Sequence, residues 1–276
     1  MTSTSATSMV PAAVLIQIRQ TVGAIHRVTP VGRNGRTWIA ETDARRVVVK
    51  RMSLDHDPHQ CSVVFAELVA LSSSPFPGFV AALEHGESWY GLFNYVEGRT
   101  PHPDDTDWDR VWCTVLNQLT LLRDRAGIVP TWDVGQLWLK RFAELPTDTL
   151  ISSLLKDLTS FAPIGRFTVA HGDLGAQNLL VTASGLKFLD WEEIGGSFEG
   201  FDAGWLLALN RVRAGPQWPH ERLLDELFDR GYAESNLRYF ERIGLLRLLY
   251  RARTLPMGEH LRALITGIVM SAIKEY

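Results

Sequence analysis

The segment from Phe167 to Trp191, FTVAHGDLGAQNLLVTASGLKFLDW, constrains this chain more than any other. Its first four residues are typical of a short strand, and a loop rich in glycine and polar residues follows. Two apolar runs, LLVT and LKFL, are joined by Ala183-Ser184-Gly185, which predicts a tight β-hairpin. Asp173 then lies on the loop, Asn178 at the end of the loop and Asp190 just past the second hairpin strand.

These three side chains suit phosphoryl transfer. Mg²⁺ prefers hard oxygen ligands and usually binds one or two protein carboxylates together with nucleotide phosphates. Asn178 and Asp190 can supply such oxygens, which leaves Asp173 to orient a substrate hydroxyl and accept its proton. Catalysis of phosphoryl transfer is mostly positioning and charge neutralisation, so the set predicts a kinase-type active site. The alternative is that Asp173 and Asn178 only form turns and that Asp190 caps a strand.

HGDLGAQN followed by LDW resembles the catalytic loop and metal-binding aspartate of the aminoglycoside phosphotransferase family, which is related to protein kinases. Kinase catalytic loops carry an aspartate with an asparagine five positions later, as here. The resemblance implies a catalytic Asp173, Mg²⁺ held by Asn178 and Asp190, and ATP or GTP as phosphoryl donor. It also implies that His171 supports the loop through hydrogen bonds and packing, rather than acting as an acid or base.

Two further features follow the loop. Trp191 stands where protein kinases have Phe-Gly after the metal aspartate, and it is typical of the superfamily members that act on small molecules. Asp202, in GFDAGWLL, resembles the family aspartate that starts the next helix and bonds the backbone of the catalytic loop. A helix N-cap explains Asp202 equally well.

The region from Val22 to Glu97 resembles the nucleotide-binding lobe of kinases. It begins with three candidate strands, Ile25–Thr29, Thr37–Ala40 and Arg46–Arg51, and two more, Phe79–Glu84 and Trp89–Tyr95, are predicted to complete a small antiparallel sheet. The connection between the first two, residues 31–36, contains two glycines and is a weak candidate for a lid that binds phosphates through backbone N–H groups. An ordinary hairpin explains the same residues.

Lys50 ends the third strand and resembles the nucleotide-binding lysine of kinases. The helix predicted over residues 59–71 carries one acidic residue, Glu67, which in the family pairs with this lysine and aims it at the α- and β-phosphates. Arg51 is the competing candidate for the role of Lys50. A solvated strand-end lysine and a plain surface glutamate are the alternative interpretations.

The run LFNYVEG, from Leu92 to Gly98, resembles the hinge between kinase lobes. By that resemblance the adenine bonds the backbone C=O of Asn94 and the backbone N–H of Val96, with Phe93 behind the base. An ordinary strand that leads to a turn fits the residues equally well.

From Pro101 onward, apolar residues recur at helical spacing. The resemblance implies an α+β, two-lobed protein-kinase-like fold, with a small antiparallel sheet in the N-lobe and a mostly helical C-lobe. We expect a tail and short helix at 1–21, a nucleotide-binding lobe at 22–97, and a C-lobe with the catalytic loop and acceptor site at 98–276. The helices predicted for the C-lobe are Asp104–Arg125, Trp132–Glu144, Thr149–Thr159, Ala203–Arg213, His220–Asp229, Leu237–Arg253 and Glu259–Lys274.

The composition of the chain limits the kinds of partner and the location that we expect. The net charge of −3 gives no global basic footprint for nucleic acid, and no apolar run reaches transmembrane length. The polar start of the chain lacks the features of a secretory signal. Cys61 and Cys113 lie in predicted helices without a CxxC pattern, which favours a cytoplasmic location. We expect a monomer or a homodimer.

The predicted function is ATP- or GTP-dependent phosphorylation of a hydroxyl group on a small molecule. An aminoglycoside or another cationic antibiotic is the leading acceptor, which would make the protein a resistance or self-protection enzyme. A metabolic kinase of the choline, homoserine or sugar type is the alternative, and a non-catalytic nucleotide-binding module is a third reading. Acidic and aromatic residues that suit a cationic acceptor also suit helix starts and cores; they are Asp104, Asp105, Asp107, Trp108, Asp109, Trp132, Asp133, Glu192, Glu193 and Trp218.

Overall fold

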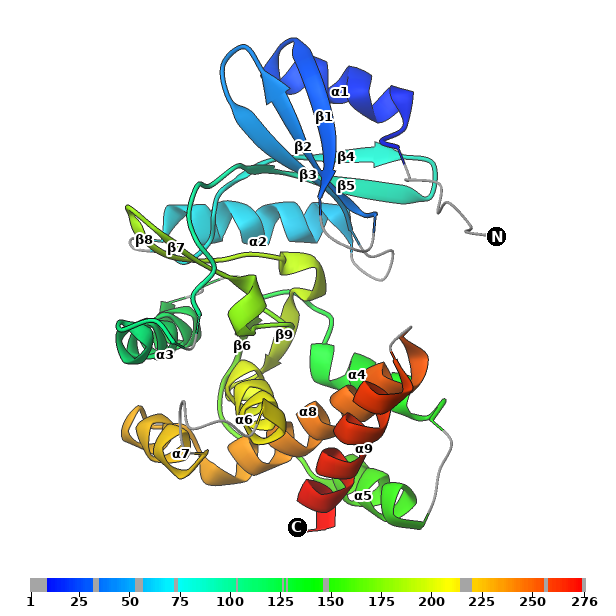
Figure 1. Cartoon of the computed structure of the whole chain (residues 1–276), viewed down its shortest axis with the longest axis vertical. Helices are drawn as coiled ribbons and strands as arrows, with labels where there is room; N and C mark the ends of the chain where they lie inside the picture. Colours follow the sequence, from blue (N-terminus) through cyan, green and yellow to red (C-terminus); the bar gives the residue numbers. More distant parts are fainter. Residues whose placement is uncertain are drawn as a thin grey trace. The chain divides into compact units, whose positions relative to one another are not determined.

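A computed structural model of the chain describes residues 9–31, 35–52, 57–71, 74–102, 104–125, 127, 129–145, 149–213, 220–255 and 258–274. The chain forms two compact units (Figure 1). Unit 1 combines Met1–Arg99 with Leu180–Glu192, and unit 2 combines Thr100–Leu179 with Glu193–Tyr276. Residues 32–34 of the predicted phosphate lid, and Trp218, lie outside the described residues.

Unit 1 is built on a five-stranded sheet in which every neighbouring pair is antiparallel. The spatial order is β1-β2-β3-β5-β4, so the strand that carries Lys50 lies in the middle of the sheet. The strands are β1 (Ile25–Val31), β2 (Thr37–Thr42), β3 (Arg46–Arg51), β4 (Phe79–His85) and β5 (Ser88–Asn94).

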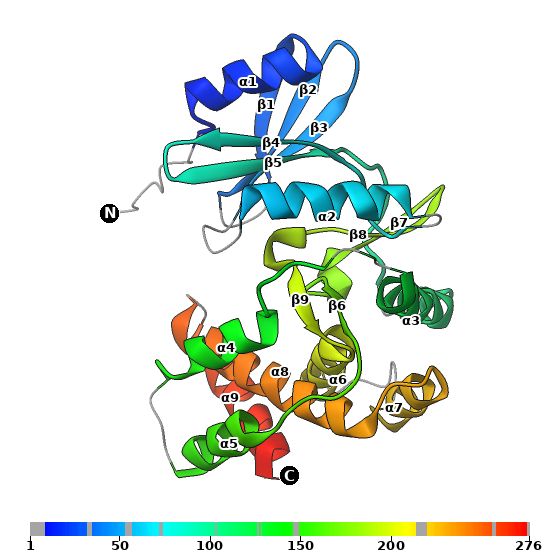
Figure 2. The same ribbon diagram turned by 180° about the vertical axis from the view of Figure 1, so that it is seen from behind.

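Two helices, α1 (Ala12–Val22) and α2 (Pro58–Ala70), pack against this sheet (Figures 1 and 2). Val14 of α1 shares a buried cluster with Val49 of β3, whereas Phe65 of α2 packs against Phe93 of β5. Successive strand residues point to opposite faces, so Lys50 lies on the face opposite Val49. Asp57 begins α2, since its carboxylate accepts the backbone N–H groups of residues 59 and 60.

The predicted hairpin after the catalytic loop is confirmed, with strands β7 (Leu179–Thr182) and β8 (Gly185–Phe188). It is attached to unit 1 by the loop between α2 and β4. The Lys187 ammonium donates to the Ser74 carbonyl at 2.8 Å, and the Phe188 N–H donates to the Pro75 carbonyl at 2.8 Å. The Phe76 ring meets the Trp191 ring edge to face at 5.3 Å between centroids. These contacts fix the segment that carries Asp190.

Unit 2 contains a two-stranded antiparallel sheet of β6 (Phe167–Ala170) and β9 (Gly195–Phe198), and the described residues around it are mostly helical. Strand β9 is not among the strands that the sequence predicts, because its residues, GGSF, carry no strand signal. The helices are α3 (Trp108–Arg125), α4 (Val134–Phe142), α5 (Thr149–Ser160), α6 (Phe201–Arg213), α7 (His220–Asp229), α8 (Glu234–Thr254) and α9 (Glu259–Lys274).

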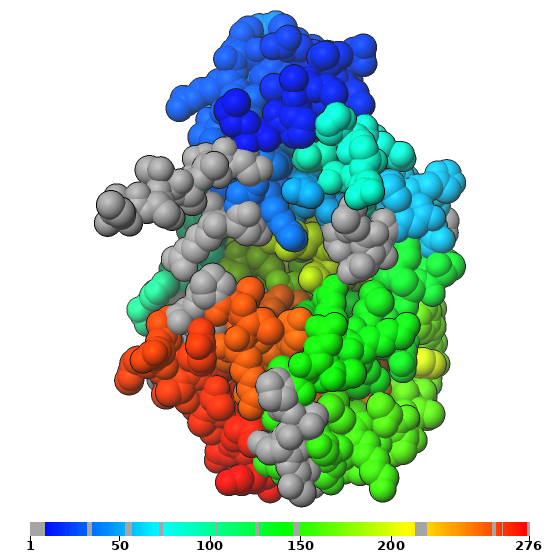
Figure 3. All heavy atoms as spheres, turned by 90° about the vertical axis from the view of Figure 1, so that its right-hand side faces the viewer, coloured from blue at the N-terminus to red at the C-terminus, as the bar shows by residue number. Residues whose placement is uncertain are grey.

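Helices α6 and α8 approach closely because both carry glycine at the crossing. A Cβ on Gly204 would lie 2.5 Å from the Cβ of Phe240, and a Cβ on Gly244 would lie 2.6 Å from the Cβ of Ala208. Helix α4 also contacts α8, and the two segments lie side by side on the surface shown in Figure 3, green and orange. Trp138 of α4 and Trp205 of α6 belong to the same buried cluster as the apolar face of α8.

The α+β fold class predicted from the sequence is confirmed by this mixture of an antiparallel sheet and helices. Among the helices of the described residues, none is both long enough and apolar enough to span a membrane.

Candidate active site

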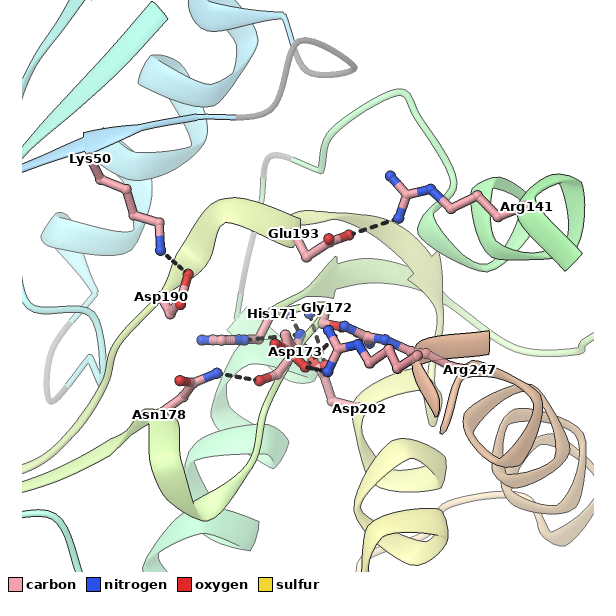
Figure 4. Close-up of polar contacts among 11 residues, drawn as sticks. Lys50, Arg141, His171, Gly172, Asp173, Asn178, Asp190, Glu193, Asp202 and Arg247 are labelled. Carbon is pink, nitrogen blue, oxygen red and sulfur yellow. Dashed lines mark hydrogen bonds and ion pairs between the residues drawn. The ribbon is translucent and has the colours of Figure 1, made fainter. Parts of the chain in front are cut away.

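The loop that follows β6 is fixed to helix α6 by one buried carboxylate. Asp202, in the first turn of α6, accepts the backbone N–H of His171 at 2.7 Å and that of Gly172 at 3.0 Å (Figure 4). Gly172 has a φ of +86°, and a Cβ there would lie 2.0 Å from the Glu193 carbonyl oxygen, so only glycine fits. Burial raises the pKa of Asp202, while His171 and these two N–H donors oppose the rise.

His171 is fully buried, and its Nδ1 accepts the backbone N–H of Asp173 at 3.2 Å. Asn178 closes the other side of the loop, because its side-chain nitrogen donates to the backbone carbonyl of Asp173 at 2.7 Å. That bond orients the amide oxygen of Asn178. A short 3₁₀ helix, Ala176–Asn178, supplies the turn that brings the asparagine back toward the aspartate. The spacing Asp-x₄-Asn thus has a direct structural cause.

The carboxylate of Asp173 lies against two guanidinium groups of α8. Oδ1 is 2.9 Å from Nη2 of Arg247 and 3.1 Å from Nη1 of Arg251. Burial alone would raise the pKa of Asp173, but the charges of Arg247 and then Arg251 outweigh it and hold the pKa below its ordinary value. Asp173 is therefore ionised at neutral pH.

Neither arginine is among the site residues predicted from the sequence. A signal is present in hindsight, because GLLRLLYRA places two arginines four residues apart within an apolar run. Such a pair lies on one face of a helix. Nothing in the sequence identifies Asp173 as the partner of that face.

In unit 1, Lys50 is 6% exposed and pairs with two carboxylates from the segment after β8. Its ammonium contacts Oδ1 of Asp190 (Figure 4). The same ammonium lies 3.4 Å from Oε2 of Glu192. Arg51, the competing candidate, is exposed at the end of β3. This difference in burial favours Lys50 over Arg51. Glu192 as a partner of the lysine was not foreseen.

Asp190 has a φ of +64°, and among the described residues it alone has a positive φ without being glycine. Asp and Asn visit this region more readily than most residues, and such conformations concentrate at functional sites. The indole N–H of Trp191 donates to the Phe188 carbonyl at 2.7 Å, which holds the reversal of the chain in place. The turn directs the Asp190 carboxylate toward Lys50.

The remaining predicted nucleotide-binding residues belong to unit 1. Glu67 is half-buried on α2, the helix that covers the sheet face of Lys50. Asn94 ends β5, where its side-chain oxygen accepts from Arg45 at 3.2 Å and its backbone N–H donates to the Gly78 carbonyl at 3.1 Å. Val96 follows two residues after the end of β5. The backbone groups expected to bind the adenine thus lie at the end of β5 and in the residues that follow it.

The donor set fits Mg²⁺ only when phosphates complete it. The described part of the chain contains no cluster of three or more His, Cys, Asp or Glu side chains that could hold a metal. Asn178 of unit 2 and Asp190 of unit 1 offer one amide and one carboxylate oxygen. Mg²⁺ accepts one or two such protein ligands and takes the rest from nucleotide phosphates and water. Each side chain, taken by itself, is thus of a type that ligates Mg²⁺ together with nucleotide phosphates.

Several acidic candidates for acceptor binding have local structural partners instead. Asp133 begins α4 and accepts the N–H groups of Gly135 and Gln136. Glu193 lies 3.4 Å from Arg141. Helix capping and ion pairing thus account for the positions of these two carboxylates. Other residues of the set also have local partners: Asp105 accepts the His102 N–H, Asp107 pairs with Arg110, Asp109 pairs with Arg222 and Trp132 donates to the Ile194 carbonyl.

The antiparallel sheet with its buried lysine, and the helical unit with its aspartate loop, together define a kinase-like phosphotransferase. The model of the phosphotransferase enzyme family matches residues 27–239, and the chain belongs to this family. The protein is thus an enzyme of the type that phosphorylates an alcohol group of a small molecule. No curated protein sequence gives a significant match.

Solved structures with the same fold cover nearly the whole chain. The choline kinase LicA from Streptococcus pneumoniae superposes with a TM-score of 0.68 at 14% identity, over 95% of this chain and 98% of that one. The aminoglycoside phosphotransferase APH(4)-Ia gives a TM-score of 0.65 at 14% identity, over 94% and 98%. A thermostable mutant of APH(4)-Ia in a ternary complex with ADP and hygromycin B gives 0.65 at 14% identity, over 94% and 99%. These likenesses show the kinase-like fold.

Proposed function

We propose that the protein transfers the γ-phosphoryl group of ATP or GTP to a hydroxyl group of a small molecule, with Asp173 as the catalytic residue. The observation that carries the proposal is the Asp173 carboxylate, ionised and held at a loop whose backbone is bonded by Asp202, His171 and Asn178. Nucleotide binding is supported by relatives solved with AMP and with ADP.

The chemistry follows from the residues. The acceptor hydroxyl attacks the γ-phosphorus, its O–P bond forms as the bond to the departing nucleoside diphosphate breaks, and its proton passes to Asp173. The transition state is loose, so the hydroxyl needs orientation more than early deprotonation. A carboxylate with a lowered pKa is a weak base but a strong hydrogen-bond acceptor, which matches this requirement.

Lys50 acts on the donor. A buried ammonium on the central strand is suited to hold the α- and β-phosphates, and its contact with Asp190 sets its direction before the nucleotide binds. Glu67 is assigned to aim the lysine, and the backbone of Asn94 and Val96 to bond the base. His171 and Asp202 support the loop. Asn178 and Asp190 would hold Mg²⁺, which neutralises charge on the phosphates when bound.

For the acceptor we propose an aminoglycoside or another cationic antibiotic, so that the protein serves resistance or self-protection in the cytoplasm. A structure of APH(4)-Ia with hygromycin B has the same fold. A choline-type metabolic kinase is the second candidate, since the choline kinase LicA superposes with a TM-score of 0.68. We expect the enzyme to act as a monomer or homodimer, on a small molecule rather than on nucleic acid or membranes.

The test is a coupled assay of nucleoside diphosphate release with ATP and with GTP, over aminoglycosides, peptide antibiotics, nucleoside antibiotics, choline, homoserine and sugars. One class should raise turnover well above the rate with water. Asp190→Ala should abolish that turnover and weaken Mg-dependent nucleotide binding, measured by calorimetry. The Ser184→Ala variant is a control, because Ser184 is exposed at the tip of the same hairpin, away from Asp190 in the chain. An Asp190→Ala enzyme with normal turnover and normal nucleotide affinity would reject the metal assignment.

A further inference from the structure

Arg247 is the most deeply buried cation in the described part of the chain, at 1% exposure in the middle of α8. Its guanidinium carbon lies over two indole rings, 4.5 Å from the centroid of Trp138 and 4.4 Å from that of Trp205. The guanidinium carbon of Arg141 lies over the first ring at 4.8 Å, and that of Arg251 over the second at 5.5 Å. Guanidinium groups and indoles from α4, α6 and α8 thus form one cluster.

The guanidinium group of Arg247 points at the catalytic loop. Nη1 of Arg247 donates to the Gly172 carbonyl, and Nη2 lies 2.9 Å from Oδ1 of Asp173 (Figure 4). Arg251, one helical turn later, contacts the same Oδ1 at 3.1 Å. Both arginine contacts therefore go to one carboxylate oxygen.

Burying this charge is costly, and a scaffold alone does not require it. Burial lowers the pKa of Arg247 to about 10, with Arg251 adding to the effect and Asp173 opposing it. The group still carries its charge at neutral pH. A buried ion pair is often no more stabilising than apolar residues of the same volume. A leucine or methionine between the two indoles would pack the core, but it would leave Asp173 without its fixed partner.

We propose that Arg247, supported by Arg251, is the positioning residue of the catalytic aspartate, holding Oδ1 of Asp173 so that Oδ2 receives the acceptor hydroxyl. The inference rests on the proposed function, in which Asp173 is the catalytic residue. The two indoles restrict the guanidinium group, which contacts both the Asp173 carboxylate and the Gly172 carbonyl. Misplacement of a reacting group by about 1 Å can reduce turnover about 10²-fold.

The experiment compares Arg247→Ala with Arg242→Ala, a change of the same type five residues earlier on α8. Turnover is measured with Mg-ATP and water as acceptor, and with any acceptor that the screen identifies. Arg247→Ala should lower kcat about 10²-fold at unchanged nucleotide KM, whereas Arg242→Ala should retain the wild-type rate. Arg247→Met fills the space beside the indoles, so it separates loss of the charge from loss of packing. It should lose the same kcat as Arg247→Ala, while its melting temperature falls less than that of Arg247→Ala.

Chemical rescue distinguishes positioning from cavity filling. Methylguanidinium should restore turnover to Arg247→Ala, while N-methylurea, of similar shape but uncharged, should not. Equal rescue by both additives, or equal rates in the two alanine variants, would overturn the proposal. If the wild-type enzyme turns over no nucleotide, the proposed function fails. Calorimetry then still tests the contact between Arg247 and Asp173. Methylguanidinium should bind Arg247→Ala and lose its affinity in Arg247→Ala/Asp173→Asn, and equal affinities would refute the pairing.

Discussion

Asp173 combines burial, two cationic neighbours and a backbone held on both sides. Asparagine has the same shape and can accept a hydrogen bond through its oxygen, but it cannot take a proton. Asp173→Asn should therefore fold and bind nucleotide nearly as the wild type does, and kcat should fall roughly 10²–10⁴-fold. Steady-state kinetics with thermal melts check this. A variant that keeps more than about a tenth of the wild-type kcat would refute the assignment.

Lys50 and Arg51 are adjacent cations with opposite environments, one buried beside Asp190 and the other exposed. Lys50→Ala should raise the nucleotide KM and lower kcat, because the phosphates lose a fixed charge. Arg51→Ala is the matched control and should change neither constant appreciably. A larger loss in Arg51→Ala would show that Arg51, and not Lys50, is the cation that binds the nucleotide.

Residues of the catalytic loop could be proposed from the sequence because they lie within one short motif. The spacing of Asp173 and Asn178 is local, and the structure shows its cause in a single 3₁₀ turn. Arg247 and Glu192 could not be found this way. Arg247 reaches the loop only through the packing of α8, and Glu192 meets Lys50 only because the hairpin is attached to unit 1.

At the scale of helices and strands, the crossing of α6 and α8 determines where Arg247 lies. The Cβ of an alanine at Gly244 would lie 2.6 Å from the Cβ of Ala208, so the helices must separate. Gly244→Ala should destabilise the protein by about 1–3 kcal/mol, as expected for overpacking. Gly267→Ala, in α9 with no atom within 4 Å of the new Cβ, should instead stabilise by up to about 1 kcal/mol.

Urea unfolding of the two variants beside the wild type measures both changes. Because both substitutions replace a helical glycine by alanine, helix propensity acts in the same direction in each. A difference in sign can then come only from the contact with α6. If both variants are more stable than the wild type, α6 and α8 do not approach each other closely at Gly244.

Periodicity predicted most helices and strands within a few residues, since apolar spacing follows from burial on one face. The ends were less well predicted; α8, for example, begins at Glu234 rather than Leu237. Strand β9 was missed for a physical reason. Gly195 and Gly196 lack side chains with strand preference, and a Cβ on Gly196 would collide with Phe167 of the paired strand. Only that pairing makes the segment a strand.

On the scale of the whole chain, one continuous motif is divided between two units. Asp173 and Asn178 belong to unit 2, whereas Asp190, twelve residues after Asn178, belongs to unit 1. A sequence gives the order of these residues along the chain, but the attachment of the hairpin to the Ser74–Phe76 loop decides the division. No local pattern around residues 74–76 indicates that attachment.

Both units contain buried acidic groups that stay protonated to high pH. Burial, with a smaller effect of Asp57, raises the pKa of Cys61 in unit 1 to about 12. Burial also raises the pKa of Tyr239 in unit 2 to about 12, with Asp133 adding to it, and it raises that of Tyr232. Unfolding returns these groups to ordinary values near 9 and 10. Above pH 9 the unfolded chain therefore binds fewer protons than the folded one, and stability must fall as pH rises.

Tyr239→Phe isolates one of these contributions. Stability from the Tyr239 phenol is fully present below pH 10.0, its unfolded value, and is lost as pH rises toward about 12, its folded value. The free energy of unfolding, measured by urea titration from pH 7 to pH 11, should fall more steeply in the wild type than in Tyr239→Phe. By pH 11 the extra loss should be about 1 kcal/mol, because one unit of pH within that window corresponds to about 1.4 kcal/mol. At pH 7 the phenol is neutral in both states, so that value serves as the reference for each protein. Parallel curves for the two proteins would show that Tyr239 ionises as readily in the folded chain as in the unfolded one.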